Sequence, residues 1–264
     1  MSTPSRAQNR LQNALLGLYR RSRQSRLMQS ALGRRLFEQA YLSYKLLLEA
    51  GPVGQLQRFV PPGSIAVDVG ANIGFFTLRF ARWVGAGGRV IAIEPEAENF
   101  AALQRRLATA RLSDRVVAIQ AIAAEAAGTA QLEINKDHPG DHKIGKGGVP
   151  VAAVTLDAAL DPHGDKPVSL VKIDVQGAEM SVLRGAAKLL ERHRPALFVE
   201  IDDKALRKQG SSAGEVFDAL AARGYRPYRL RRFAAPELMA VPTAPRDGYE
   251  DILFLNTAAP STAP

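Results

Sequence analysis

The 264-residue sequence contains no cysteine. This absence excludes a disulfide framework, an iron–sulfur cluster, a thiolate zinc site and a catalytic thiol, and it fits a reducing compartment. Histidine is also scarce, with four in the chain. His138 and His142 are four residues apart, but Pro139-Gly140-Asp141 lies between them. We therefore interpret both histidines as loop residues rather than as metal ligands on one helix face.

Long hydrophobic runs are absent as well. No stretch reaches the roughly 18 to 20 apolar residues that a membrane-spanning helix needs, and no signal-peptide hydrophobic region follows Met1. We expect a soluble, cytoplasmic protein. A chain of this length with average apolar content can form one domain with a small appendage.

Acidic residues are rare at the start of the chain. Residues 1–60 hold ten arginines and lysines against two glutamates, and the net charge of the whole chain is +9. The basic character therefore belongs to an N-terminal arm. The arm could be a helical extension packed on the main domain, or a surface that binds an anionic membrane or glycolipid. Nucleic-acid binding ranks third because aromatic residues are sparse, and an organellar transit peptide also fits the Arg-rich start.

The chain divides into three parts. Apolar residues follow a helical spacing in residues 9–20 and 27–49, and Pro61-Pro62-Gly63 then opens a new unit. We expect a basic helical extension at 1–60, one α/β domain at 61–257, and a disordered Ala/Pro-rich tail at 258–264.

Apolar runs rich in β-formers alternate with helical segments after residue 61. This alternation predicts a mostly parallel sheet that is covered by helices on both faces. Pro95 suits the first position of a helix, Ser212 and Glu215 form a capping-box pattern, and Gly224 suits a left-handed stop. Tyr225–Leu230 and Asp251–Asn256 predict a hairpin-like end to the sheet. The runs predicted as strands are Ile65–Val69, Val90–Glu94, Val116–Ala121, Leu170–Asp174 and Ala196–Ile201.

A glycine-containing turn follows the first of these strands. It reads Asp68-Val-Gly70-Ala-Asn72-Ile-Gly74 and is expected to open a helix, where an open α/β sheet binds a nucleotide-like ligand. The middle glycine of the dinucleotide pattern G-x-G-x-x-G is missing, and an acid stands in front. Glu94, twenty positions beyond Gly74, is placed to accept both hydroxyls of a ribose. Acids favour a ligand with an ammonium and a sulfonium, which predicts S-adenosylmethionine rather than NAD.

Five segments follow one another along the chain: VDVGANIGFFTLRFA, RVIAIEPEAENFAALQRRL, VTLDAAL, VSLVKIDVQGAEMSVLRGAAKLL and PALFVEID. In this order and spacing they resemble the FkbM family of S-adenosylmethionine-dependent methyltransferases. The resemblance covers about Gly63 to Asp202. It implies a class I methyltransferase fold, Rossmann-like, with a seven-stranded, mostly parallel sheet whose last strand is antiparallel. It also implies methyl transfer mostly to hydroxyl oxygens of sugars, glycans or secondary metabolites.

The resemblance also implies roles for individual residues toward the cofactor. Gly70 and Asn72 would lie along its methionine part, Asp68 would hold its amino group, and Glu94 would hold its ribose. The family usually has a Ser/Asp pair near the adenine, where this chain has Ala124 and Glu125.

A second group of polar residues, VKIDVQGAE, ends the fourth predicted strand. Lys172 and Asp174 share one face of this strand, because side chains alternate along a strand. Asp174 lies at the carboxyl end, where parallel sheets form their ligand crevice. Gln176 stands where the family more often has Glu. Glu179 begins the next helix, so both a capping role and a catalytic one are open to it.

Three residues are candidates for the general base that takes a proton from an acceptor hydroxyl. Asp174 is the first, Glu200 at the end of the fifth strand is the second, and His142 in a loop is the third. Asp174 and Glu200 could supply oxygen ligands for a magnesium-like ion, but no third ligand is evident, so we predict no metal site.

The polar, glycine-rich segment Asn135–Gly148 is either a lid or a flexible loop. As a lid it would bring Lys143 and Lys146 to an acidic substrate. We expect an S-adenosylmethionine-dependent O-methyltransferase with a small-molecule or glycan acceptor. Methyl transfer to nitrogen or to a macromolecule is one alternative, and a non-catalytic cofactor-binding interaction module is another.

Overall fold

The computed structural model describes residues 53–135, 142–145, 147–231, 235–239 and 249–257. The two helical stretches predicted at 9–20 and 27–49, the basic arm up to residue 52, and the tail at 258–264 lie outside these residues, as do His138 and Lys146. No helix among the described residues is long and apolar enough to cross a membrane.

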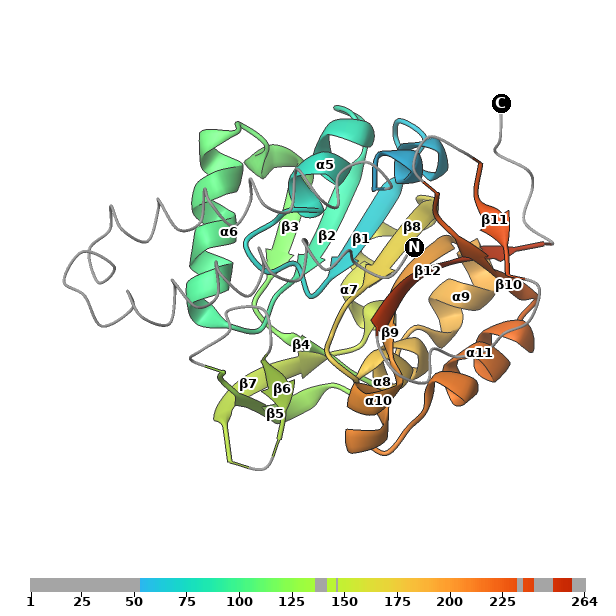
Figure 1. Cartoon of the computed structure of the whole chain (residues 1–264). Helices are drawn as coiled ribbons and strands as arrows, with labels where there is room; N and C mark the ends of the chain where they lie inside the picture. Colours follow the sequence, from blue (N-terminus) through green and yellow to red (C-terminus); the bar gives the residue numbers. More distant parts are fainter. Residues whose placement is uncertain (1–52, 136–141, 146, 232–234, 240–248, 258–264) are drawn as a thin grey trace, which may run out of the picture.

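A central eight-stranded sheet organises the described part of the chain (Figure 1). Its order is β11-β10-β12-β9-β8-β1-β2-β3, and β12 runs antiparallel to both of its neighbours. The expected α/β fold with a mostly parallel sheet and an antiparallel last strand is therefore confirmed. The strands are β1 (Ile65–Val69), β2 (Arg89–Ile93), β3 (Val116–Ile119), β8 (Val168–Ile173), β9 (Ala196–Asp202), β10 (Tyr225–Arg229), β11 (Glu237–Leu238) and β12 (Tyr249–Asn256).

Two details of the predicted sheet were wrong. The sheet has eight strands rather than seven, because the two-residue β11 pairs with β10 at one edge. A strand this short carries no periodic pattern. The run at Val116 was also predicted to be buried on both faces, but β3 is the other edge of the sheet, and Val117 is exposed.

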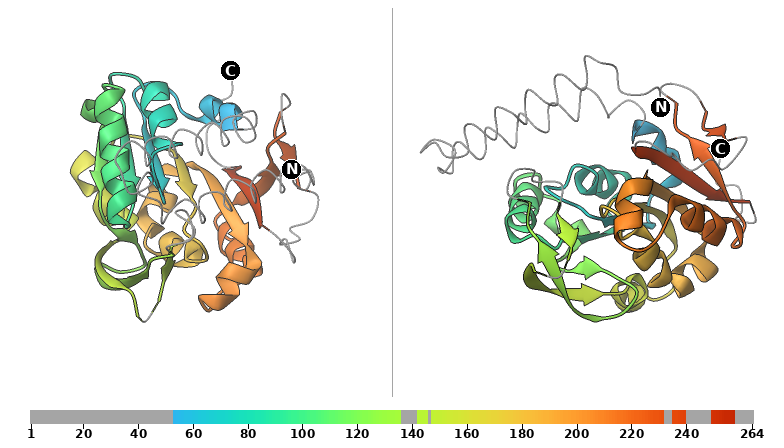
Figure 2. Two further views of the ribbon diagram at one scale, coloured as in Figure 1. Left: turned by 60° about the vertical axis from the view of Figure 1, so that its left-hand side comes forward. Right: turned by 60° about the horizontal axis from the view of Figure 1, so that its bottom comes forward.

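Helices and short 3-10 turns cover both faces of the central sheet (Figure 2). Val53, Leu56 and Val60 from the first turn are buried in the core, so the packed body includes residues before Pro61. The segments are η1 (Gly54–Phe59), α5 (Thr77–Trp83), α6 (Ala97–Thr109), η2 (Ser113–Arg115), α7 (Leu156–Leu160), η3 (Asp161–His163), α8 (Glu179–Arg184), α9 (Ala187–His193), α10 (Asp203–Lys208) and α11 (Ala213–Ala221).

Local sequence explains how several helices begin. Ser212 accepts the N–H of Glu215 at 3.2 Å and caps α11, as predicted. Pro95 is not the first residue of α6, because Glu96 occupies the N-cap and accepts the N–H groups of Glu98 and Asn99. Carboxylates are favoured at this position because they meet unpaired backbone donors. Gly224 has φ +82°, which confirms the left-handed stop.

A second, four-stranded sheet follows β3 and was not predicted. Its order is β4-β7-β5-β6, and it lies beside α8 and α10 in Figure 1. The Gln209 side chain after α10 donates to the Ile144 carbonyl at 2.9 Å and joins the two parts. Within the segment Asn135–Gly148, Lys143 and Ile144 form β6, and residues 136–141 and 146 lie outside the described residues. The strands are β4 (Ile122–Ala123), β5 (Gly128–Glu133), β6 (Lys143–Ile144) and β7 (Val149–Val154).

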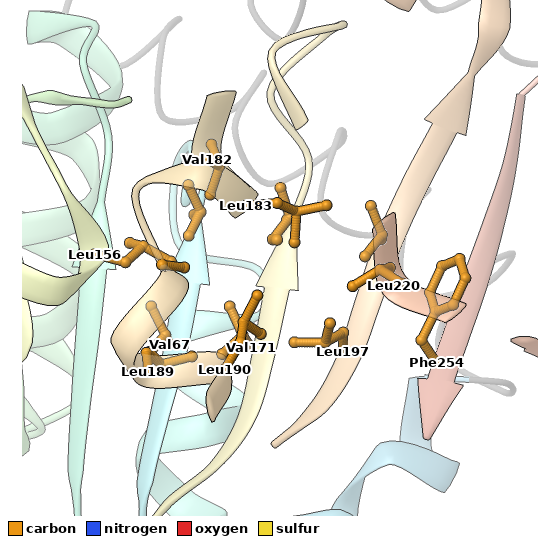
Figure 3. Close-up of a cluster of buried hydrophobic side chains, with 14 of the residues drawn as sticks. Val67, Leu156, Val171, Val182, Leu183, Leu189, Leu190, Leu197, Leu220 and Phe254 are labelled. Atoms are coloured by element: carbon orange, nitrogen blue, oxygen red, sulfur yellow. The ribbon is translucent and has the colours of Figure 1, made fainter. Parts of the chain in front are cut away.

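Apolar side chains form one cluster on each face of the central sheet. Figure 3 shows part of the cluster between the sheet and α7, α8, α9 and α11, in which Val67, Val171 and Leu197 come from neighbouring strands. Phe254 of β12 reaches the same cluster and meets Phe217 of α11 edge-on, with ring centroids 5.1 Å apart. The antiparallel end of the sheet is thus held by the same core as its parallel part.

We predict that Phe254→Ala lowers the free energy of unfolding by about 3–5 kcal/mol, because it removes a buried ring and leaves a cavity. Urea unfolding followed by circular dichroism measures this loss. The matched control is Leu238→Ala on β11, whose side chain is exposed and whose loss should cost less than about 0.5 kcal/mol. Equal losses in the two variants would contradict the placement of β12 in the core.

Candidate functional site

The register of the strands brings four predicted site positions into one row. Val69 pairs with both Ile93 and Ile173, and Ile173 pairs with Val199. The next residue along each strand lies at the carboxyl edge of the sheet, where open α/β sheets bind ligands. The residues of this row are Glu94 (β2), Gly70 (β1), Asp174 (β8) and Glu200 (β9).

The turn after β1 lies against the turn after β8. Gly70 has φ +74°, and a Cβ atom on it would lie 1.9 Å from the carbonyl oxygen of Asp174. Glycine is therefore required here by the contact between the two turns. Gly74 has φ +86°, which strains any residue with a Cβ, and a Cβ there would also require the Leu103 side chain to shift. The predicted helix begins three residues later, at Thr77.

Backbone N–H groups of the turn from Gly70 to Gly74 are all bonded within the protein. This is unlike an anion-binding turn, in which several N–H groups converge on the ligand. The acceptors are Ile93 O for Gly70 and Ala71, Glu94 Oε2 for Asn72, Asn72 Oδ1 for Ile73, and Ala71 O for Gly74, at 2.7 to 3.0 Å.

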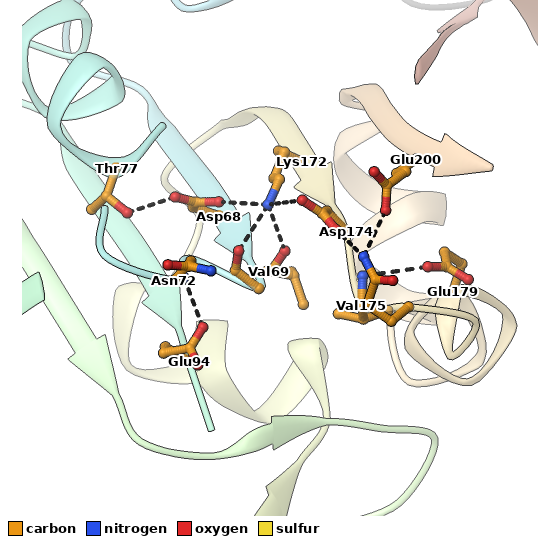
Figure 4. A network of polar contacts seen from close by, with 12 residues as sticks. Asp68, Val69, Asn72, Thr77, Glu94, Lys172, Asp174, Val175, Glu179 and Glu200 are labelled. Carbon is orange, nitrogen blue, oxygen red and sulfur yellow. Dashed lines mark hydrogen bonds and ion pairs between the residues drawn. The ribbon is translucent and has the colours of Figure 1, made fainter. Parts of the chain in front are cut away.

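Lys172 holds the ends of β1 and β8 together. Its Nζ lies 3.5 Å from Asp68 Oδ1 and 3.2 Å from Asp174 Oδ2. The same ammonium donates to the carbonyl oxygens of Gly70 at 2.8 Å and Val69 at 3.3 Å (Figure 4). The sequence placed Lys172 and Asp174 on one face, and the ion pair between them confirms that placement.

Asp68 lies beneath the crevice rather than in it. Its exposed fraction is 0%, and Thr77 Oγ1 donates to its Oδ2 at 2.5 Å. Both carboxylate oxygens thus have partners within the protein, Thr77 and Lys172. A direct contact with the ammonium of a ligand, as predicted from the sequence, would require this side chain to leave them.

Glu94 is buried at the end of β2. Its carboxylate accepts the N–H of Asn72 at 2.7 Å and the N–H of Glu96 at 3.0 Å. Burial raises the pKa of Glu94 to about 7, because desolvation of the charge outweighs these hydrogen bonds. The carboxyl group therefore lies against the turn after β1, where burial favours its protonated form more than water does.

Asp174 and Glu200 are neighbours in the row and are joined by Gln176. The side chain of Asp174 is 26% exposed. The amide nitrogen of Gln176 lies 3.3 Å from Asp174 Oδ1 and 3.0 Å from Glu200 Oε2 (Figure 4). Sequence reasoning did not assign this bridge. The sequence signal for this bridge is that residue 176 is Gln, where the family more often has Glu.

Glu179 caps the turn that precedes its own helix. Its Oε1 accepts the N–H groups of Val175 at 3.3 Å and Gly177 at 3.1 Å, which supports the capping interpretation. The residue is 1% exposed, and its Oε2 has no hydrogen-bond partner. Burial raises the pKa of Glu179 to about 7, and the nearby charge of Asp174 adds to the increase.

Two predicted site residues lie elsewhere. Glu125 is 56% exposed, pairs with Arg184 at 3.2 Å, and lines a polar hollow of about 250 Å³ together with Thr155 and Lys188. His142 lies beside β6, where its Nδ1 accepts the N–H of Asn135 at 3.1 Å. Their roles toward adenine and acceptor stay predictions.

Two other features of the described residues bear on the choice of site. An apolar groove of about 440 Å³ between β3 and α7 contains none of the predicted site residues. Among the side chains that the structure describes, no three of His, Asp and Glu are arranged to hold a metal ion.

The methyltransferase FkbM domain matches residues 68–227, from the acid before the glycine turn to the middle of β10. The chain belongs to the FkbM methyltransferase family. The match includes every residue of the carboxyl-edge row, and the predicted resemblance is thereby confirmed.

Relatives of this chain include methyltransferase sdnD of Sordaria araneosa. The two are 29% identical over 160 residues, which cover 48% of this chain and 61% of sdnD. The chain thus spans less than two thirds of that relative. The crystal structure of methyltransferase FkbM from Methylobacillus flagellatus KT is 17% identical, with a TM-score of 0.48 over 94% of this chain and 60% of that one. The O-methyltransferase TomG from Streptomyces achromogenes is 16% identical, with a TM-score of 0.45 over 80% of each chain.

The raised pKa of Glu179 makes stability depend on pH. Its folded-state pKa of about 7 lies above the ordinary value of 4.5. The favourable contribution of the protonated Glu179 to the free energy of unfolding is therefore complete below about pH 4.5 and is lost as the pH rises through 7. We predict that the free energy of unfolding of Glu179→Gln, a neutral isostere, increases relative to that of the wild type by roughly 2–3 kcal/mol when the pH is raised from 5 to 8. Urea unfolding at the two pH values measures this change.

The exposed Glu191 of α9 provides the control, since Glu191→Gln removes one carboxylate without emptying a buried site. A Glu179→Gln variant whose stability changes with pH as much as that of the wild type would refute the assignment.

Proposed function

We propose that this chain transfers the methyl group of S-adenosylmethionine to a hydroxyl group of a saccharide, a glycolipid or a related small molecule. The observation that carries the proposal is the turn after β1, whose N–H groups from Gly70 to Gly74 are all engaged by the protein. A dinucleotide needs such groups for its pyrophosphate. A ligand with a positively charged sulfur and an ammonium does not.

The residues around the turn fit this cofactor. Glu94 and Asp174 follow the two strands that flank β1, and Glu200 lies one strand further along. Carboxylates in such a row suit a cationic ligand better than a polyphosphate. The carbonyl of Asp174 occupies the place where a Cβ of residue 70 would stand, so the turn after β1 presents backbone and no side chain at that point. When bound, S-adenosylmethionine supplies a methyl group activated by its sulfonium.

Each residue then has a defined task in binding. Glu94 would accept the ribose hydroxyls, and Gly70 and Asn72 would lie along the methionine part. Asp68 would act from beneath, by orienting Lys172 and hence the carbonyl oxygens of Val69 and Gly70. Glu125 is retained as the candidate on the adenine side.

Asp174 is the proposed general base. It is the partly exposed carboxylate next to the glycine turn, and Lys172 and Gln176 orient its two oxygens. An aliphatic hydroxyl loses its proton during methyl transfer, so a base within hydrogen-bond reach speeds the reaction. Glu200 is the second candidate and His142 the third. A hydroxyl acceptor is supported by the family resemblance and by this carboxylate.

We predict that Glu94→Gln weakens binding of S-adenosylmethionine by about 10- to 100-fold, because one charged acceptor for the ribose is lost. Isothermal titration with S-adenosylmethionine, S-adenosylhomocysteine and NAD measures the effect. The control is Glu98→Gln, an exposed carboxylate of the first turn of α6, which should bind as the wild type does. Tight binding of NAD, with no response to the other two ligands, would defeat the proposal.

Asp174→Asn should reduce kcat by about 10²- to 10⁴-fold while the Kd for S-adenosylmethionine changes less than about threefold. The asparagine keeps the size of the side chain but does not accept the proton. Release of S-adenosylhomocysteine, measured with a panel of sugar and glycolipid acceptors, gives kcat. Asp218→Asn on the exposed face of α11 controls for loss of charge. Full activity of Asp174→Asn on the best acceptor would show that another group is the base.

A further inference from the structure

We propose that Gln176 is a positioning residue that holds Asp174 and Glu200 side by side as charged groups on the acceptor side of the site. The inference rests on the proposed function, because it gives these two carboxylates their task. It adds a residue that no sequence argument assigned, and it indicates why this chain has an amide where a third acid is more common in the family.

The contacts of the amide support this role. One –NH2 group has two hydrogens, and Nε2 of Gln176 lies within hydrogen-bond reach of one oxygen on each carboxylate, at 3.3 and 3.0 Å. The nitrogen must be the atom that faces them, since an amide oxygen would place its lone pairs against two acceptors. Asp174 then has one oxygen on Gln176 and the other on Lys172.

The surroundings explain why such a bridge is needed. Asp174 and Glu200 extend the paired positions Ile173 and Val199 of β8 and β9, so they are adjacent in the row. Asp251 of β12 pairs with Glu200 from the other side. Like charges this close repel one another, and each carboxylate favours protonation of the next.

Several charged groups of the described residues bear on this pair. The Lys172 ammonium of β8 lies 3.2 Å from Asp174 and 3.5 Å from Asp68 of β1. Glu179 of α8 acts on Asp174 with a like charge. The amide of Gln176 therefore adds donors without adding another charge.

The backbone at Gln176 is held in a conformation that side chains rarely adopt. Its φ is +55°, in the left-handed region that is uncommon for residues with a Cβ. Gly177 follows with φ +103°, and a Cβ on it would meet the Ala205 carbonyl of α10 at 2.5 Å. The turn is thus pinned against α10. This unfavourable conformation is what directs the amide toward the two acids.

The bridge also bears on the acceptor. A hydroxyl that approaches Asp174 then meets a carboxylate that stays charged and oriented by the amide.

The test follows the carboxyl groups directly and needs no acceptor. Carboxyl ¹³C resonances of Asp174 and Glu200 are titrated by NMR in the full chain, with Asp174→Asn and Glu200→Gln used for assignment. In Gln176→Met, which removes both donors, we expect the titration midpoints to rise by about one pH unit. Gln176→Glu should raise them further. Gln176→Gly, which suits the left-handed backbone, should behave like Gln176→Met.

Gln104→Glu on the exposed face of α6 controls for an added charge and should leave both midpoints in place. Unchanged midpoints in Gln176→Met and Gln176→Gly would overturn the bridge. Titration with S-adenosylmethionine separates the two proposals. If the wild-type chain does not bind S-adenosylmethionine but the midpoints rise in Gln176→Met, the bridge is supported and the proposed function is contradicted.

Discussion

The ammonium group of Lys172 is the interaction on which the candidate site depends. It is buried among four oxygen atoms, from Asp68, Asp174, Val69 and Gly70, which belong to the ends of two adjacent strands. Without it, two carboxylates would face each other across β1 and β8 in a region with little water, where an unpaired charge is costly. The Lys172 ammonium therefore stabilises both the buried Asp68 and the partly exposed Asp174 in their charged forms.

Acidic groups in this crevice do not share one environment. Glu94 and Glu179 are buried, and burial raises the pKa of each to about 7. Asp174 is partly exposed and has a cation and an amide as partners. Two carboxyl groups whose pKa is raised, those of Glu94 and Glu179, are thus found in the same region as Asp174, which is in contact with the Lys172 ammonium. Such a division suits a site that must both bind hydroxyls and accept a proton.

Much of this arrangement could be predicted from the sequence, because it depends on periodicity and on strand ends. The run Ile65–Val69 matches β1 residue for residue, and Glu94, Asp174 and Glu200 follow buried strands, so their meeting at one edge is a consequence of parallel pairing. The second sheet could not be predicted, since β4 and β6 have two residues each and leave no periodic signal. The bridge by Gln176 depends on a left-handed backbone that nothing in its local sequence requires. The burial of Asp68 depends on Lys172, which is 104 residues away in the chain.

The missing side chain at Gly70 has a mechanical consequence for the site as a whole. Because the carbonyl of Asp174 fills the space where a Cβ would stand, the turn that would carry the cofactor and the turn that would carry the base form one rigid contact. A displacement of one turn toward the other would therefore meet the Asp174 carbonyl at once.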